Sequence, residues 1–417
     1  MFRVLSGAWA LFLGMMLLQV GNGMQGTVLG LRGVIEGFST LQLSVIMSCY
    51  FVGFLFGSRM APQMIRRVGH VRVFAALGSM ISAVMILYPT VTDPWAWSVG
   101  RVVIGFCFSG VFVTAESWLN NSASNGTRGK ALSLYMIVQM IGLVSAQGLI
   151  VLADPAGYVL FVIPCVLVSL SFAPILLSVG PTPSFDTTKP LSLLQILKIS
   201  PLGCVGMFLT GGVFAAQFGM AAVYGAEAGL SVGQISIFVA SFYTAALLAQ
   251  YPLGWLSDRM DRRVLIAIVA LVTGIGGVIG MLLGETFWLL LLAAILIGGS
   301  SNPLYALLIA YTNDFLELDD MAAAAGGMLF INGVGAIAGP LMLGWMMSLM
   351  GPGGYFFYIA ILMFAMVLYA IYRMTQRPAP QASPSDGFAP VTRSASPVAV
   401  EFAQEIAIDA AQNEKPA

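Results

Sequence analysis

The sequence predicts an all-α integral membrane protein with twelve transmembrane helices in two homologous six-helix halves. Three observations support this fold class: the residue composition, the recurrence of long apolar stretches, and the similarity between the two halves of the chain. Of the 417 residues, 59% are hydrophobic and only 9% are charged, whereas soluble domains carry about 25% charged residues. A chain of this composition is expected to lie in a lipid bilayer.

Apolar stretches of about 18 residues or more, each long enough to cross a hydrocarbon core of about 30 Å, recur along the chain. The first six helices are expected at residues 8–31, 41–61, 72–90, 95–119, 131–152 and 157–178. The second six are expected at residues 201–224, 232–256, 264–283, 286–311, 322–349 and 354–373. The first stretch is too long for the apolar segment of a signal peptide, so we interpret it as a membrane helix.

The pattern of helices divides the chain into two halves, a linker and a tail. The linker contains three prolines, and the tail is rich in Pro, Ala and Ser, so we expect the tail to be disordered. The predicted N-terminal half, linker, C-terminal half and tail comprise residues 1–180, 181–200, 201–373 and 374–417.

Positive charges predict the orientation of the chain, because Lys and Arg resist translocation across the membrane. An even number of helices places both termini on one side. If that side is the cytoplasm, all of the 18 Lys and Arg except Arg32 and Arg101 belong to cytoplasmic segments. Arg32 would then lie outside and Arg101 within a helix. We therefore predict a multi-pass protein with both termini in the cytoplasm.

The two halves resemble copies of one unit. A shift of 192 residues superposes Gly14 on Gly206, Gln25 on Gln217, Ser39 on Ser231, Gln42 on Gln234 and Arg67 on Arg259. One more residue of shift superposes Gly105 on Gly298, Asn120 on Asn313 and Gly142 on Gly335. Repeats of this kind place a substrate site at their interface near the bilayer midplane and expose it alternately to each side.

The most specific motif is GWLSDRMDRR at residues 254–263, at the end of the eighth predicted helix. It resembles the signature G-x-L-x-D-R-x-G-R-R of the major facilitator superfamily, with Asp261 in place of the second glycine. In that family the signature lies between helices 2 and 3 and again between helices 8 and 9. The first-half copy, at residues 62–72, keeps Arg67, Gly69 and Arg72 but has Pro62 and Arg66 in place of the glycine and the aspartate.

This resemblance implies the major facilitator fold and a gate at the cytoplasmic face. Asp258, Arg259 and Arg262 would hold that face closed when the transporter opens outward, with Asp314 as an acidic partner. Arg67 would correspondingly reach Glu116 at the end of the fourth helix. The alternative is a group of charges that sets the topology and pairs only weakly at the surface.

Arg101 begins a second motif, RVVIG at residues 101–105, which matches the intramembrane R-x-x-x-G of the superfamily. A charge at the centre of a membrane helix costs at least about 2.5 kcal/mol, so Arg101 should face the protein interior or a cavity. It could anchor an anionic group of the substrate or modulate proton binding. Alternatively, it could be a structural arginine bonded to carbonyl groups.

Uncharged polar residues complete a predicted substrate cavity between helices 1, 4, 7 and 10. Amides within hydrocarbon need hydrogen-bond partners, which a cavity with its substrate or a neighbouring helix could provide. The predicted cavity residues are Arg101, Gln19, Asn22, Gln25, Gln217, Asn302 and Tyr305.

Four local segments sharpen the resemblance: VGHVR at residues 68–72, ESWL at 116–119, RGKALSLYM at 128–136 and QYPLGWLSD at 250–258. They are similar to the YcaD-like branch of bacterial major facilitators, and the resemblance spans residues 8–373. The resemblance implies a transporter of the bacterial cytoplasmic (inner) membrane. The substrate of the YcaD-like branch is poorly defined.

Other functional classes find little support in the sequence. It has no glycine-rich phosphate loop, no metal-spaced His and Cys set and no nucleophile elbow, so we expect no enzyme, no cofactor and no bound metal. Zero net charge without a basic domain argues against nucleic-acid binding.

We predict a monomeric secondary transporter of a small polar or anionic solute. Uptake or efflux is left open, as is coupling to a proton, because only Glu116 is an acid within a predicted span. The alternative is a membrane sensor or scaffold that reuses the fold without transport.

Overall fold

The computed structural model describes residues 2–122, 128–177, 192–316, 318–376 and 398–399, and all regular structure within them is helical. The first half comprises α1 (Phe2–Ile35), α2 (Thr40–Val68), α3 (His70–Leu87), α4 (Pro94–Ser122), α5 (Arg128–Ile150) and α6 (Val159–Leu177). The second half comprises α7 (Leu193–Ile199), α8 (Pro201–Ala215), η2 (Ala216–Met220), α9 (Ala221–Glu227), α10 (Val232–Ser257), α11 (Arg262–Leu283), α12 (Phe287–Asn313), α13 (Leu318–Met350) and α14 (Gly354–Gln376).

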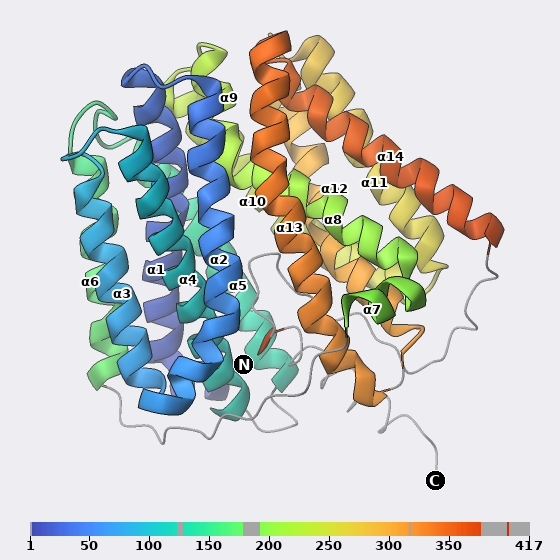
Figure 1. Cartoon of the computed structure of the whole chain (residues 1–417), viewed down its shortest axis with the longest axis horizontal. Helices are drawn as coiled ribbons and strands as arrows, with labels where there is room; N and C mark the ends of the chain where they lie inside the picture. Colours follow the sequence, from blue (N-terminus) through green and yellow to red (C-terminus); the bar gives the residue numbers. More distant parts are fainter. Residues whose placement is uncertain (1, 123–127, 178–191, 317, 377–397, 400–417) are drawn as a thin grey trace.

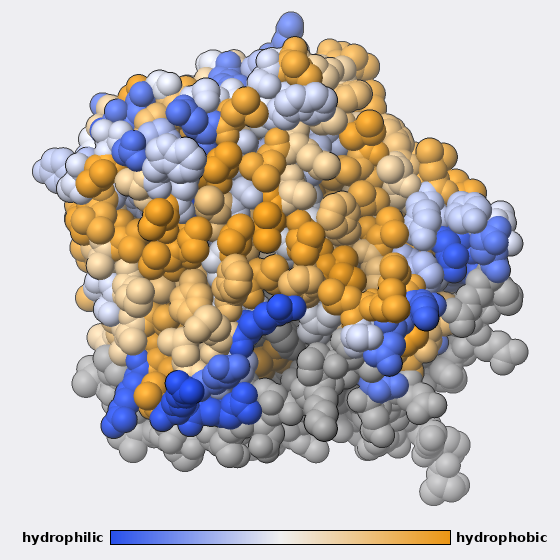
Figure 2. All heavy atoms as spheres, in the orientation of Figure 1, coloured by the Kyte–Doolittle hydropathy of each residue, from blue (hydrophilic) through white to orange (hydrophobic). Residues whose placement is uncertain are grey.

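Ten helical segments in the described residues are long and apolar enough to cross a membrane, with α8, η2 and α9 counted as one segment. Together with α1, of 34 residues, and α6, of 19 residues, they form two sets of six. On the face shown in Figure 2, hydrophobic side chains form a band across the middle of the molecule, with hydrophilic side chains toward both ends. The predicted fold class is thus confirmed. Most of the predicted linker and tail lies outside the described residues.

The two sets of six helices stand side by side, with α2 of one set next to α13 of the other (Figure 1). We call the end that carries the α2–α3 and α10–α11 turns the arginine-rich end, because Arg66, Arg67, Arg262 and Arg263 lie there. We call the opposite end, where α1 ends and α2 begins, the outer end.

Glycines bring the same pair of helices into close contact in each half. A Cβ on Gly105 of α4 would lie 1.9 Å from the carbonyl oxygen of Tyr50 on α2. In the second half, a Cβ on Gly298 of α12 would lie 2.4 Å from the carbonyl oxygen of Phe242 on α10. The shifts that superpose the two halves also relate these contacts: a shift of 192 residues takes Tyr50 to Phe242, and a shift of 193 takes Gly105 to Gly298. Small residues allow such close approach between membrane helices, and here they preserve it in both copies.

Matching capping boxes start α2 and α10. Ser39 accepts a hydrogen bond from the backbone of Gln42, whose side chain accepts one from the backbone N–H of Ser39. Ser231 and Gln234 make the same pair of bonds at the start of α10. Each box satisfies backbone donors that a helix start would otherwise leave exposed. The polar residues that revealed the repeat in the sequence therefore have a structural role.

The two halves contact each other closely at the outer end. A Cβ on Gly30 of α1 would lie 3.1 Å from the Cβ of Ala222 on α9. Thr40, the first residue of α2, donates a hydrogen bond to Glu227 at the end of α9 (2.6 Å). Farther along α2, Ser48 donates to the carbonyl oxygen of Ile337 on α13 (2.6 Å). These contacts close the outer end.

The crossing at Gly105 yields a stability prediction. Gly105→Ala should lower the free energy of unfolding by about 3 kcal/mol, at the upper end of the overpacking range, because the added methyl meets a backbone carbonyl rather than a flexible side chain. Gly148→Ala on α5 is the control, since nothing lies within 4 Å of its added methyl. Thermal unfolding in detergent measures both; equal melting temperatures for the two variants would contradict the prediction.

Candidate functional site

Four of the predicted cavity residues form one buried chain of hydrogen bonds in the first half. Arg101 on α4 donates to Oε1 of Gln25 on α1. Gln25 donates to Asn22 (3.3 Å), and Asn22 donates to Gln19 (3.1 Å). Gln19 donates to Oε1 of Gln139 on α5 (2.8 Å), a residue that the sequence pattern did not indicate. The chain joins three helices through side chains where water is excluded.

Tyr50 on α2 links this chain to the buried charge. Its hydroxyl donates to Oδ1 of Asn22 (3.3 Å), and the Cζ atom of Arg101 lies 4.7 Å from its ring centroid. Tyr50 is not among the predicted cavity residues, although the repeat pairs it with another aromatic residue, Phe242. Tyr50 therefore belongs to the site both as a hydrogen-bond donor and as a cation–π partner.

Arg101 itself is fully buried, with 0% of its surface exposed. Besides Gln25, its guanidinium approaches Sδ of Met47 at 3.3 Å, and its Nε has no hydrogen-bond partner. No carboxylate forms an ion pair with it in the described residues. A buried cation without a counter-ion is costly, so the surroundings of Arg101 favour an approaching anion.

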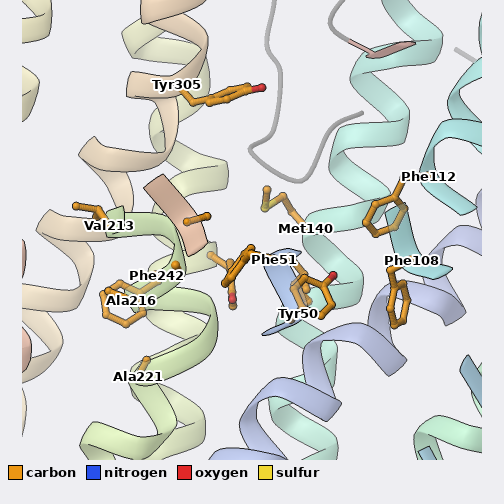
Figure 3. Packing of buried hydrophobic residues seen from close by; sticks show 14 of the residues in the cluster. Tyr50, Phe51, Phe108, Phe112, Met140, Val213, Ala216, Ala221, Phe242 and Tyr305 are labelled. Carbon is orange, nitrogen blue, oxygen red and sulfur yellow. The ribbon is translucent and has the colours of Figure 1, made fainter. Parts of the chain in front are cut away.

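The second half holds a smaller polar group on η2 and α12. Gln217 donates to Oγ of Ser301 (2.7 Å), and Asn302 donates to Oε1 of Gln217 (3.1 Å) and to the carbonyl oxygen of Gly298 (3.0 Å). Tyr305, one turn farther along α12, is fully buried, and its ring points toward the first half (Figure 3). Within the described residues, no hydrogen bond joins this group to the chain around Arg101.

A π-helical turn, η2, interrupts the seventh membrane segment at Ala216–Met220. The hydroxyl of Tyr355 on α14 donates to the carbonyl oxygen of Ala216 (3.3 Å) at this turn. Turns of this kind are rare and often mark functional sites. Here the turn carries Gln217, which bonds to α12, and Phe218, which packs on Tyr50 with ring centroids 5.4 Å apart. No sequence pattern predicted this turn.

A cavity lies where the two halves meet, beside Tyr50 and Phe218. Its volume of about 30 Å³ is enough for only one or two water molecules. Figure 3 shows Tyr50 and Phe51 between the helices of the two halves. The lining residues are Asn22, Tyr50, Phe51, Phe54, Leu55, Ser58, Phe214, Phe218, Leu329, Asn332, Gly333 and Ala336.

A larger cleft of about 490 Å³ separates α5 from α10 toward the arginine-rich end. Met136 and Met140 line its α5 side, while Gln250, Trp255 and Asp258 line its α10 side. The halves are thus in contact at the outer end and are separated between these two helices at the arginine-rich end.

The charges of the second-half signature pair within their own half. Arg262 on α11 forms an ion pair with Asp314 at the end of α12 and lies 3.9 Å from Asp258. Arg259 is exposed and places its guanidinium 4.1 Å from the ring centroid of Trp255. The expected contact between Arg262 and Asp314 is therefore present. None of the ion pairs among the described residues crosses to the first half.

The degraded first-half copy behaves differently. Arg67 is exposed at the end of α2, whereas Glu116 on α4 is buried and accepts a hydrogen bond from Tyr135 (3.1 Å). No ion pair joins Arg67 to Glu116 in this conformation of the described residues.

Asp261, which departs from the family signature, has a local structural role. It accepts a hydrogen bond from the backbone N–H of Arg263 (2.9 Å) and so caps α11. Hydrogen bonds from the Arg263 guanidinium hold the pKa of this carboxyl below its ordinary value. The corresponding residue in the first half is Gly69, which turns the chain at a φ of 84°. A capping carboxylate in one copy and a glycine turn in the other thus connect the same two helices.

Comparison with known protein families identifies the fold. The family model described as Major Facilitator Superfamily matches residues 11–224 and again residues 202–407. The chain belongs to the major facilitator superfamily. The first match covers most of the first six-helix set and runs into the seventh membrane segment, and the second match covers the second set from α8 onward.

Curated relatives of this superfamily member include MFS-type transporters named YcaD, which are themselves uncharacterized. The protein of Salmonella arizonae is 24% identical over 376 residues, covering 89% of this chain and 97% of the relative. The protein of an Escherichia coli strain is 25% identical over 374 residues, covering 88% and 96%. The predicted similarity to the YcaD-like branch is thus confirmed.

Solved structures of other major facilitators have the same fold. The nucleoside transporter NupG superposes with a TM-score of 0.76 at 14% identity, covering 88% of this chain and 98% of that one. A D-xylose-proton symporter gives 0.71 at 14% identity, covering 90% and 98%. FucP in the outward conformation gives only 0.56 at 14% identity, covering 87% and 97%.

The hydrogen bond between Arg101 and Gln25 yields a second stability prediction. Gln25→Leu should lower the free energy of unfolding by about 1.5–3 kcal/mol, because it removes an acceptor from a buried charge. Gln147→Leu is the control, since it breaks only neutral hydrogen bonds to α1 and should cost about 1 kcal/mol.

The double variant Arg101→Met with Gln25→Leu should recover part of the loss, since no charge then remains buried without its acceptor. Thermal unfolding of the wild type, the single variants Arg101→Met and Gln25→Leu, and the double variant gives the coupling free energy between the two side chains. Strictly additive losses would show that the two side chains do not depend on each other.

Proposed function

We propose that this major facilitator is a secondary active transporter, which moves a small solute across the bacterial cytoplasmic membrane by alternating access. The observation that carries the proposal is the asymmetry of the interface between the halves. Thr40 bonds to Glu227 at the outer end, whereas a cleft of about 490 Å³ separates α5 and α10 at the arginine-rich end. This arrangement corresponds to one of the two states that rocking between repeats requires.

The positive-inside rule makes the arginine-rich end the cytoplasmic one, with both termini in the cytoplasm. The conformation is then open inward. The side chain of Asp258 is 41% exposed and lines the cleft between α5 and α10. In the outward-open state, Asp258 would become the contact that closes the cytoplasmic face, as the family signature implies.

The solute carries an anionic or polar group in this proposal, and Arg101 supplies the attraction. A coupling proton would bind at Glu116, the one buried carboxylate in the described part of the chain. Glu116 lies toward the cytoplasmic end of α4 and accepts from Tyr135 (3.1 Å). A non-transporting sensor remains the second function, and the experiment below distinguishes the two.

Cross-linking the outer end should stop transport. In a background with Cys49, Cys107, Cys165 and Cys204 replaced by serine, Gly30→Cys and Ala222→Cys would join α1 to α9 across the halves. Their Cβ atoms would lie 3.1 Å apart, so a small outward shift of either helix would bring them to the roughly 3.5–4.5 Å of a disulfide. The protein is reconstituted in liposomes, and mass spectrometry follows the uptake of a mixture of small metabolites. Oxidation should form the disulfide and abolish uptake, and reduction of the disulfide should restore it.

The matched control joins two helices within one half. Gly299→Cys and Ala245→Cys would place their Cβ atoms 3.5 Å apart on α12 and α10, so a disulfide there should leave transport unchanged. Uptake that persists in the oxidised Gly30–Ala222 variant would contradict alternating access. No uptake by the cysteine-free parent, with the fold intact, would favour the sensor.

A further inference from the structure

The cavity between the two halves is lined by only four polar side chains, those of Asn22, Tyr50, Ser58 and Asn332, and each already donates a hydrogen bond within the protein. Asn22 donates to Gln19 and accepts from both Gln25 and Tyr50. The other polar side chains of the lining are bonded as well. The amide of Asn332 donates to the carbonyl oxygen of Met207 (2.9 Å), and Ser58 donates to that of Leu55 (2.9 Å).

A polyhydroxylated solute would therefore find few partners here. A site that recognises a sugar must offer free donors and acceptors, because each hydroxyl buried without a hydrogen bond is costly. In this cavity, such a solute could accept hydrogen bonds from Tyr50, Ser58 or Asn332 only by displacing the bonds that these side chains already donate within the protein. The polar groups of the lining act to hold the helices rather than to bind hydroxyl groups.

Aromatic faces dominate the rest of the lining and come from both halves. Tyr50, Phe51 and Phe54 project from α2, and Phe214 and Phe218 from α8 and η2. Phe218 packs on Phe214 with ring centroids 5.7 Å apart and contacts Phe51 at 6.2 Å across the halves. These separations are typical of direct aromatic pairs. When the halves move apart, the rings of α2 lose their contacts with the rings of α8 and η2. An apolar ring of a solute can then take the place of the lost contact.

The charge near the cavity is positive. The Arg101 guanidinium stacks 4.7 Å from the ring centroid of Tyr50, whose side chain lines the cavity. No acidic residue belongs to the lining. Unscreened by a counter-ion, this buried cation repels a cationic solute and attracts an anionic one. Aromatic faces by themselves would favour a cationic solute. The positive charge of Arg101 makes the cavity favour an anionic one instead.

We propose that the transported solute is a ring-bearing, mainly apolar monoanion of the aromatic carboxylate class, bound between Tyr50, Phe51 and Phe218 with its charge toward Arg101. The inference rests on the proposed transport function and narrows its substrate. It sets this chain apart from the xylose symporter that shares its fold, because the cavity offers rings where a sugar requires free hydrogen-bonding groups.

Three probes test the two parts of the inference on the full chain in detergent. 3-Phenylpropionate carries a ring and a negative charge, 3-phenylpropylamine carries the same ring and a positive charge, and D-xylose carries only hydroxyl groups. Each ligand that binds the folded state raises its melting temperature, and the concentration dependence gives a dissociation constant. We expect 3-phenylpropionate to bind at least about tenfold more tightly than the amine and D-xylose to have no effect.

Two variants assign the effects to residues. Phe218→Leu should raise the dissociation constant of 3-phenylpropionate about threefold to tenfold through the loss of one ring partner. The control, Phe364→Leu, removes a half-buried ring that packs on Gly274 of α11 away from the cavity, and it should leave binding unchanged. Arg101→Met should abolish the preference for the anion over the amine while both still bind.

Several results would overturn the inference. Stabilisation by D-xylose without stabilisation by 3-phenylpropionate would exclude a ring-bearing substrate. Equal binding of the anion and the amine to the wild type would refute the role of the charge. If Phe218→Leu and Phe364→Leu changed the dissociation constant of 3-phenylpropionate equally, the ring of the ligand would not bind beside Phe218. If no probe binds while the disulfide between α1 and α9 still blocks uptake, the substrate class is wrong and the transport proposal stands.

Discussion

Contact between helix backbones at glycine residues is the constraint on which the rest of this structure depends. At Gly105 and Gly298, a single Cβ would overlap a carbonyl of the neighbouring helix. Because lipid supplies no hydrophobic driving force between helices, such close packing is what holds each bundle together. The contacts occur in corresponding places within the two halves. Each half is therefore closely packed on itself, as the rocking motion proposed above requires.

The buried polar groups add a second constraint. Arg101 and the amides of α1 lie where water does not reach, so they must bond to one another, and the resulting chain from Arg101 to Gln139 stays within the first half. Gln217 and Asn302 form a separate group in the second half. Neither group has to break when the halves separate. Between them lie mainly aromatic rings, and Phe218 packs on Tyr50 and Phe51 across the halves through ring contacts rather than hydrogen bonds.

Much of the fold could be predicted from the sequence, because its signals are local. Composition and apolar length identify the membrane helices, and the polar residues of the capping boxes repeat at a fixed spacing. The signature at residues 254–263 identifies the family and indicates that Arg262 and Asp314 lie close together. Selecting Arg101, Asn22 and Gln25 as buried inside the protein follows from the cost of polar groups in hydrocarbon. These inferences require no knowledge of which helices touch.

The tertiary structure alone decided how those residues are grouped. The π-helical turn at Ala216–Met220 depends on support from Tyr355, which is distant in the chain, and the part played by Tyr50 depends on where α2 meets α4 and η2. Which end of the interface is closed is likewise a property of contacts between halves, such as that of Thr40 with Glu227. The sequence by itself determined what must be buried in the membrane, since the cost of exposure is set residue by residue. The structure decided which buried groups face one another across the interface, because that depends on helix packing between residues far apart in the chain.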